Sequence, residues 1–172
     1  VLDNLGHHMF RPFRTVRATG RLLQQVAQSN QQLARPTSDT ANAKAARRRL
    51  SDALGAMNQL RQRRNRVFVI SDLAGPLDVW QASLHRLARH HLVHVVQISD
   101  PLDSELPPTG VYNIAHGDKT VSFYSGDNAL RARYAGDHKK REAQIVELCR
   151  HPALTLQKLS TADTDWDAIP WD

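Results

Sequence analysis

Apolar residues change their spacing near residue 67, from a helical period before it to short continuous runs after it. Before this point, apolar side chains recur at steps of three and four within residues 20–34 and 41–64, which places them on one face of a helix. Residues 35–40 contain proline and small polar residues that end one helix and begin another. The pattern predicts two amphipathic helices, with Leu22, Leu23, Val26 and Leu33 on the apolar face of the first and Ala46, Leu50, Ala53, Met57 and Leu60 on that of the second.

Two short apolar runs, at residues 67–70 and 92–98, are separated by one helical pattern. Both runs are rich in β-branched residues, and Asp78 is placed to cap the helix between them. Continuous apolar strands joined through a helix are typical of a parallel sheet that is buried on both faces. The sequence thus predicts a right-handed β-α-β unit, in which the helix buries Trp80, Leu84, Leu87 and His91.

The rest of the chain adds a hairpin, a long helix and a further strand. A turn at residues 116–118 separates two runs of strand-forming residues, and Pro152 ends the helical pattern that follows them. The predicted elements are a proline-rich acidic loop over 101–109, strands over 111–114 and 120–124, a helix over 128–150 with Lys139, Lys140 and Arg141 in solvent, and a last short strand over 154–159.

These elements predict one α/β domain over residues 1–172, with a doubly wound, mostly parallel sheet flanked by helices and an inserted β-hairpin. A chain of 172 residues with 41% hydrophobic residues suits a single globular domain. No apolar run approaches the ~20 residues that a membrane-spanning helix requires. Cys149 is the single cysteine, which rules out an internal disulfide and fits a cytoplasmic protein.

Polar side chains follow each strand of the predicted parallel sheet. The tripeptide Ile-Ser-Asp ends two strands, at Ser71-Asp72 and Ser99-Asp100, and Thr161 follows the third. Ligands of open α/β sheets bind beyond the carboxyl ends of the strands, so we expect these residues to form a recognition edge for a partner or a hard cation such as Mg²⁺. The alternative is that they only end strands and cap helices.

The chain resembles the C-terminal part of the bacterial family known as domain of unknown function 58. The resemblance covers nearly the whole chain, and its specific motifs lie between residues 67 and 161. These motifs are Val69-Ile70-Ser71-Asp72, the helix from Trp80 to His91, the tract Asp100-Pro101-Leu102-Asp103-Ser104-Glu105-Leu106-Pro107 with Gly110, the tract from Arg133 to Arg141, and Leu159-Ser160-Thr161.

The resemblance implies a von Willebrand factor A-like fold, which often carries a metal-ion-dependent adhesion site. Asp72 occupies the position of the third-loop aspartate of such a site, and Thr40 is a candidate for its threonine. The Asp-x-Ser-x-Ser motif of the first loop does not occur in residues 1–172, and the chain begins with Val1 rather than Met. We therefore expect a C-terminal piece that starts after the first strand, with Mg²⁺ bound only in the full-length protein.

The resemblance also implies a non-enzymatic interaction module that works beside a MoxR-type AAA+ ATPase, as an adaptor or assembly factor. Its expected recognition surface is the strand-end edge, formed by Ser71, Asp72, Ser99, Asp100 and Thr161. Catalysis has little support in the residues, because Cys149 lies on an amphipathic helix and no nucleophile elbow, phosphate loop or dinucleotide glycine motif occurs. His90, His91 and His94 fall on two different elements, which does not favour a zinc site.

The charge distribution supports an alternative function. Residues 1–66 hold 13 Lys and Arg against 3 Asp and Glu, although the whole chain has a net charge of only +6. The arginine-rich helices of residues 41–66 would neutralise phosphates in a nucleic-acid-binding protein. Residues 14–67 contain no aromatic residue for base stacking, so a solvated helical face or an acidic protein partner is the preferred interpretation, and nucleic acid is an unlikely partner.

Overall fold

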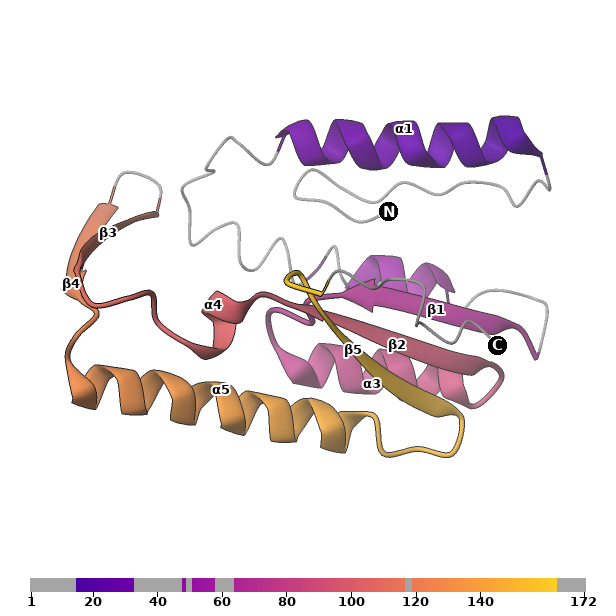
Figure 1. Ribbon diagram of the computed structural model, residues 1–172. Helices are drawn as coiled ribbons and strands as arrows, with labels where there is room; N and C mark the ends of the chain where they lie inside the picture. Colours follow the sequence, from indigo (N-terminus) through magenta and orange to yellow (C-terminus); the bar gives the residue numbers. More distant parts are fainter. Residues whose placement is uncertain (1–14, 33–47, 49–50, 58–63, 117–118, 164–172) are drawn as a thin grey trace.

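The computed structural model describes residues 15–32, 48, 51–57, 64–116 and 119–163. Within these residues, three parallel strands form one sheet in the order β1-β2-β5, and a separate antiparallel pair forms a hairpin. Figure 1 shows helices α3 and α5 packed along the same face of the parallel sheet. The α/β class, the parallel sheet and the inserted hairpin predicted from the sequence are confirmed. The elements are α1 (Val16–Gln32), β1 (Arg66–Ser71), α3 (Leu77–Ala88), β2 (Leu92–Ser99), α4 (Pro101–Ser104), β3 (Val111–His116), β4 (Lys119–Tyr124), α5 (Asn128–Leu148) and β5 (Leu154–Ser160).

The core lies between this sheet face and the two helices. Alternate strand residues point to opposite faces, and the inward ones are valines and leucines that meet the apolar stripes of α3 and α5. The predicted stripe of α3 is confirmed, and His91 is buried just beyond the end of that helix. The buried cluster includes Val67, Val69, Val93, Val95 and Leu154 from the strands, Trp80, Leu84 and Leu87 from α3, and Ile145 and Leu148 from α5.

The second face of the sheet departs from the prediction that both faces are buried. Phe68 is 40% and Ile70 is 62% exposed on β1, whereas Val96 of β2 on the same face is only 2% exposed. The continuous apolar run of β1 therefore reflects the residue types that favour strands, and burial on both faces reaches only the central strand.

The connection from β1 to α3 is a tight loop with unusual backbone geometry. Leu73 has φ 52° and Gly75 has φ 85°, and both lie in the left-handed region. Leu73 tolerates this conformation because its side chain is fully buried in the core. The helix starts after Pro76 with no side-chain cap, so the prediction that Asp78 caps it is wrong; Asp78 lies in the first turn, where a carboxylate favours the helix dipole.

The segment between β2 and the hairpin is more ordered than the predicted loop, because α4 forms one helical turn at its start. The hairpin has the predicted strands in a register that pairs Val111 with Tyr124 and Ile114 with Val121. Its last strand passes closely to the start of α5 at Gly126, where an added Cβ would lie only 2.6 Å from the Tyr124 ring. A side chain at this position would force the Tyr124 ring or the Thr109 side chain to shift.

The amino-terminal helices are described only in part. α1 covers most of the first predicted helix, and residues 51–57 are helical inside the second. Leu54 is 4% exposed and belongs to the core, and Met57 packs against the core cluster. The most buried described residue of this helix is therefore Leu54, the neighbour of the predicted Ala53. None of the described helices is long and apolar enough to span a membrane.

Replacement of a core leucine tests this packing. Leu84→Ala removes a side chain that is fully buried between α3 and the sheet, and it is expected to lower the free energy of unfolding by about 2–5 kcal/mol. Urea denaturation followed by circular dichroism measures the change. Val146→Ala on the half-exposed side of α5 is the control, with an expected loss of less than about 1 kcal/mol; equal losses in the two variants would contradict the assignment of the core.

Candidate functional site

The carboxyl ends of β2 and β5 are joined by hydrogen bonds between predicted site residues. The backbone N–H of Thr161 donates to the carbonyl of Ser99 at 2.9 Å, and the Thr161 hydroxyl donates to Asp100 Oδ2 at 2.7 Å. The Ser99 hydroxyl donates to the carbonyl of Leu159 at 3.3 Å. Ser99, Asp100 and Thr161 thus form one connected group at the strand-end edge.

Asp100 also caps the short helix α4. Its Oδ1 accepts from the backbone N–H of Leu102 at 2.9 Å, while the carboxylate of Asp103 accepts from the backbone N–H of Asp100 at 2.8 Å, which completes a capping box. The hydrogen bond from Thr161, followed by that from Leu102, holds the pKa of Asp100 below its ordinary value. The alternative prediction, that this residue only caps a helix, is therefore correct for Oδ1, while Oδ2 accepts the hydrogen bond from Thr161.

Ser71 and Asp72 form a second group one strand away. Asp72 Oδ1 accepts from the backbone N–H of Ala74 at 2.9 Å and from the Ser71 hydroxyl at 3.3 Å. The Ser71 hydroxyl accepts in turn from the backbone N–H of Leu73 at 3.1 Å. These bonds stabilise the left-handed turn after β1, and they leave the exposed Asp72 carboxylate at the same sheet edge as the first group.

The predicted metal ligands are not assembled by the described residues. Thr40 lies outside them, and within them no group of three histidine, cysteine or acidic side chains is arranged to hold a metal ion. Asp72 already accepts two hydrogen bonds on one oxygen. The described residues therefore do not by themselves form an Mg²⁺ site, and Mg²⁺ binding by the full-length protein stays a prediction.

Arg141 of α5 secures the loop after β1. Its guanidinium donates to the backbone carbonyls of Leu73 and Gly75, and it is partly buried. The prediction that Arg141 lies in solvent is wrong, although its neighbours Lys139 and Lys140 are exposed as expected. Helical spacing alone gave no sign of this role, because the carbonyls that need a donor are more than 60 residues away in the sequence.

Two other α5 side chains hold the segment after β2. The Tyr134 hydroxyl donates to the carbonyl of Leu102 at 2.6 Å, and Arg131 donates to the carbonyls of Pro107 and Ser125 at 3.2 and 3.0 Å. The fully buried Ser125 donates to the carbonyl of Pro108 at 2.7 Å. The distinctive tract from Asp100 to Gly110 therefore has its backbone fixed by side chains from α5 and the hairpin.

A cavity of about 440 Å³ opens at the same edge. Its walls are the loop after β1, the end of β2, α4 and one side of α5. Sequence reasoning missed it because its lining comes from four separate segments. The lining residues are Asp72, Leu73, Ala74, Gln97, Ile98, Ser99, Asp103, Tyr134, Asp137, His138, Arg141, Glu142 and Ile145.

A polar row crosses the floor of this strand-end cavity. Gln97 is 5% exposed and donates through Nε2 to Glu142 Oε1 at 2.6 Å, while Lys158 donates to the other oxygen of Glu142. Burial alone would raise the pKa of Glu142, but the hydrogen bonds from Lys158 and Gln97 and the charges of Lys158 and His138 outweigh it, so the pKa lies below its ordinary value. Glu142 is thus held as a carboxylate.

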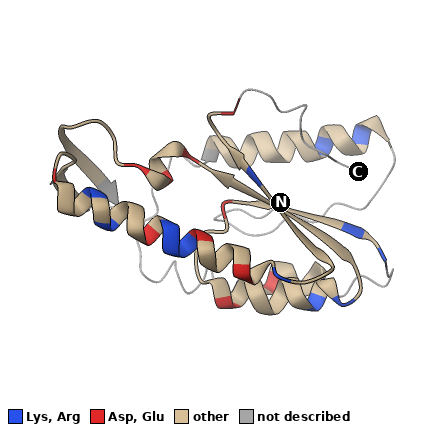
Figure 2. Ribbon diagram, turned by 60° about the horizontal axis from the view of Figure 1, so that its bottom comes forward, with Lys and Arg blue, Asp and Glu red and all other residues tan. Residues whose placement is uncertain are grey.

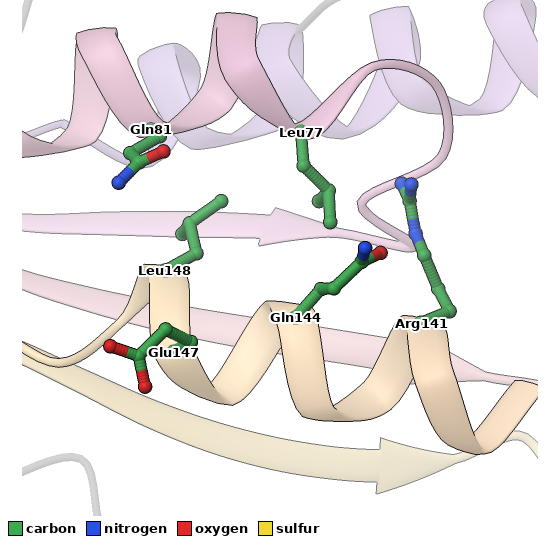
Figure 3. Close-up of a pocket in the computed structure, with 6 residues that line it drawn as sticks. All are labelled: Leu77, Gln81, Arg141, Gln144, Glu147 and Leu148. Atoms are coloured by element: carbon green, nitrogen blue, oxygen red, sulfur yellow. The ribbon is translucent and has the colours of Figure 1, made fainter.

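A second groove of about 410 Å³ runs between α3 and α5. Figure 3 shows Leu77 and Gln81 of α3 facing Gln144 and Leu148 of α5 across it, with Arg141 at one end. Arg141 therefore lines both the groove and the strand-end cavity.

Three other side chains with reactive groups, Cys149, His85 and His94, are bonded or buried within the fold. Cys149 is 7% exposed, and its burial raises the pKa of the thiol, which disfavours the reactive thiolate. His85 bonds through Nε2 to the carbonyl of Leu148 at 2.9 Å, near the end of α5. His94 stacks on Phe68 and bonds through Nδ1 to the Thr155 hydroxyl at 2.8 Å, so it is part of the sheet.

Comparison with known proteins gives a family and uncharacterized relatives. Residues 6–144 match the family described as "Protein of unknown function DUF58". An uncharacterized protein of Mycobacterium avium is 32% identical over 123 residues, which cover 69% of this chain and 70% of that protein. Uncharacterized proteins of Mycobacterium tuberculosis and Mycobacterium bovis are 33% identical over 121 residues, or 68% of this chain. The match spans only 37% of those two relatives, and no solved structure matches the chain.

Neutralising Glu142 tests the polar row. Because its pKa in the folded protein lies below the ordinary value of 4.5, its charge stabilises the fold above about pH 4.5, and this contribution disappears as the pH falls through the folded pKa. Glu142→Gln is expected to lower the free energy of unfolding at pH 7 and to lose this deficit on acidification. Urea denaturation at several pH values measures both effects. Glu147→Gln on the exposed side of α5 is the control, and an equal, pH-independent deficit in both variants would contradict the role of the row.

Removing the Thr161 hydroxyl tests the link between β2 and β5. Thr161→Val is expected to raise the pKa of Asp100 towards its ordinary value, because the largest contribution to its lowering is lost. NMR titration of the Asp100 carboxyl carbon measures the pKa. Thr155→Val, which removes a hydroxyl bonded to His94 instead, is expected to leave it unchanged; an unchanged pKa in Thr161→Val would show that the bond does not persist in solution.

Proposed function

Because the chain belongs to the DUF58 family, whose function is unknown, we propose that it is a non-enzymatic protein-interaction module that works with a MoxR-type AAA+ ATPase. Its role would be that of an adaptor or assembly factor. The contact surface is the strand-end edge formed by Ser71, Asp72, Ser99, Asp100 and Thr161.

One observation carries this proposal: the connected group of Ser99, Asp100 and Thr161 is exposed or half-exposed, yet held in place. An exposed carboxylate fixed by its own hydrogen bonds loses little conformational entropy when a partner binds. The Asp100 carboxylate is charged at neutral pH, as electrostatic recognition requires, and the hydrogen bonds from Thr161 and Leu102 lower its pKa further. Figure 2 shows an acidic position on α4, beside this edge.

Contact rather than catalysis is supported by how the reactive groups are used. The Ser99 hydroxyl donates to a backbone carbonyl, and the Ser71 hydroxyl bonds to Asp72. The buried Cys149 has a raised pKa. The Asp72 carboxylate that accepts from Ser71 also accepts from the backbone N–H of Ala74, so this pair stabilises the loop after β1, and Cys149 belongs to the core.

The basic amino-terminal half adds long-range attraction. Arg48, Arg64 and Arg66 are exposed among the described residues. Exposed arginines steer an acidic partner surface and raise the rate of association more than the affinity. They would attract nucleic acid as well, which makes retention on DNA a necessary comparison.

A binding measurement with the purified MoxR-type ATPase of the same organism tests the proposal. The double variant Asp72→Ala/Asp100→Ala is expected to weaken binding at least about tenfold, because it removes both carboxylates of the edge. Biolayer interferometry with the immobilised chain gives the affinity and both rates.

The control is Glu147→Ala, an exposed acid near the last turn of α5 at the other end of the sheet, which is expected to leave the affinity within about twofold. No binding of the ATPase by the unmodified chain, together with salt-dependent retention on DNA, would replace this function by the nucleic-acid alternative.

A further inference from the structure

The strand-end cavity has an excess of acidic groups. Of its described lining residues, Asp72, Asp103, Asp137 and Glu142 are acidic, against Arg141 and His138. Figure 2 shows both signs of charge along α5 and an acidic position on α4. The exposed carboxylates lie at the mouth, where they attract cations before contact.

Several hydrogen-bond donors of the cavity are used by the protein itself, while Asp72 keeps one carboxylate oxygen without a hydrogen bond from the part of the chain that the structure describes. Arg141 donates to the carbonyls of Leu73 and Gly75, and the Tyr134 hydroxyl donates to the carbonyl of Leu102. Within the described residues, both hydrogen bonds to Asp72 go to Oδ1, and Oδ2 receives none. A ligand that carries N–H donors therefore finds an acceptor at Asp72 Oδ2.

Gln97 provides an independent indication of a ligand. Its side chain forms part of the cavity lining and is 5% exposed, and its Nε2 is bonded to Glu142. Its Oε1 is buried and accepts no hydrogen bond from the described residues. Buried acceptors are nearly always satisfied, so a donor is missing at this point. Since Gln97 lines the cavity, a donor that completes its hydrogen bonding would come from a group bound there.

The arrangement suits an organic cation better than a metal ion. The carboxylates come from different walls, and no three of the described acids, histidines or cysteines converge at metal-binding distance. A cavity of about 440 Å³ accommodates a long side chain, and Leu73, Ile98 and Ile145 offer apolar surface to its methylene groups.

We propose that this cavity receives an arginine or lysine side chain of the protein partner, with the cationic head at Gln97 and Glu142 and the stem along the apolar wall. Arginine fits best, since its guanidinium carries several N–H donors in a fixed plane and can serve the Gln97 amide oxygen and a carboxylate together. This inference rests on the proposed function, because it takes the bound side chain from a protein partner.

NMR titration of the full chain tests the site directly, with the capped tripeptide acetyl-Gly-Arg-Gly-amide as the probe. Saturable shifts are expected at the side-chain amide of Gln97 and at the backbone amides of Asp72 and Ser99, and they should weaken as salt is added. The same peptide with glutamate in place of arginine should give none. Absence of saturable shifts with the arginine peptide, or equal shifts with the glutamate peptide, would overturn the proposal.

Two variants locate the bound head. Gln97→Met keeps the length of the side chain and removes its amide, and it is expected to raise the Kd at least about tenfold. Gln157→Met is the matched control, because Gln157 lies on the neighbouring strand and, by alternation, on the opposite sheet face. Asp72→Asn changes an exposed residue and is not expected to disturb the packing around Gln97. It should raise the Kd by a smaller factor. An unchanged Kd in both Gln97→Met and Asp72→Asn would overturn the proposal.

Three further outcomes are decisive. Spermidine that binds more than tenfold tighter than the arginine peptide would overturn a protein side chain as the source. A chain that binds the ATPase but not the arginine peptide refutes this inference alone. A chain that binds the arginine peptide but not the ATPase supports the cavity and refutes the proposed function.

Discussion

Backbone carbonyls that leave the end of a parallel sheet need donors, and in this protein one helix supplies them. Arg141, Tyr134 and Arg131 of α5 donate to carbonyls of the loop after β1 and of the segment after β2. Without these donors the carbonyls would have to turn towards water, and the two loops would lose their shape. The strand-end edge and its cavity therefore exist because α5 lies along the sheet with long polar side chains facing the loops.

The same helix also joins the core, which imposes a division along its length. Ile145 and Leu148 near its carboxyl end pack among valines and leucines, whereas Glu142, one turn earlier, meets Gln97 and Lys158. A partly buried charge row is stabilising only when its members are satisfied together. The interface between α5 and the sheet is therefore polar near the carboxyl ends of the strands, where the cavity lies, and apolar near their amino ends, where the core lies.

The sequence predicted those features that depend on near neighbours. Spacing of apolar residues located the β-α-β unit, the hairpin and α5 with boundaries close to those observed. It failed where distant groups decide: Arg141 looked solvated because its acceptors are far away in the chain, and the orphaned acceptor of Gln97 has no local signature. Asp78 was predicted as the N-cap because aspartate is a residue type that caps helices, yet the N-cap residue of α3 is Pro76. The edge residues Ser99, Asp100 and Thr161 were predictable, since parallel strands end together.

Arg141 belongs to two surfaces at once, as one wall of the strand-end cavity and one end of the α3–α5 groove. Its hold on the carbonyls of Leu73 and Gly75 fixes its position in both. Anything that draws the guanidinium away from those carbonyls changes the shape of the two hollows together. By thermodynamic reciprocity, occupation of either hollow that moves Arg141 must alter the affinity of the other, so a single side chain couples them.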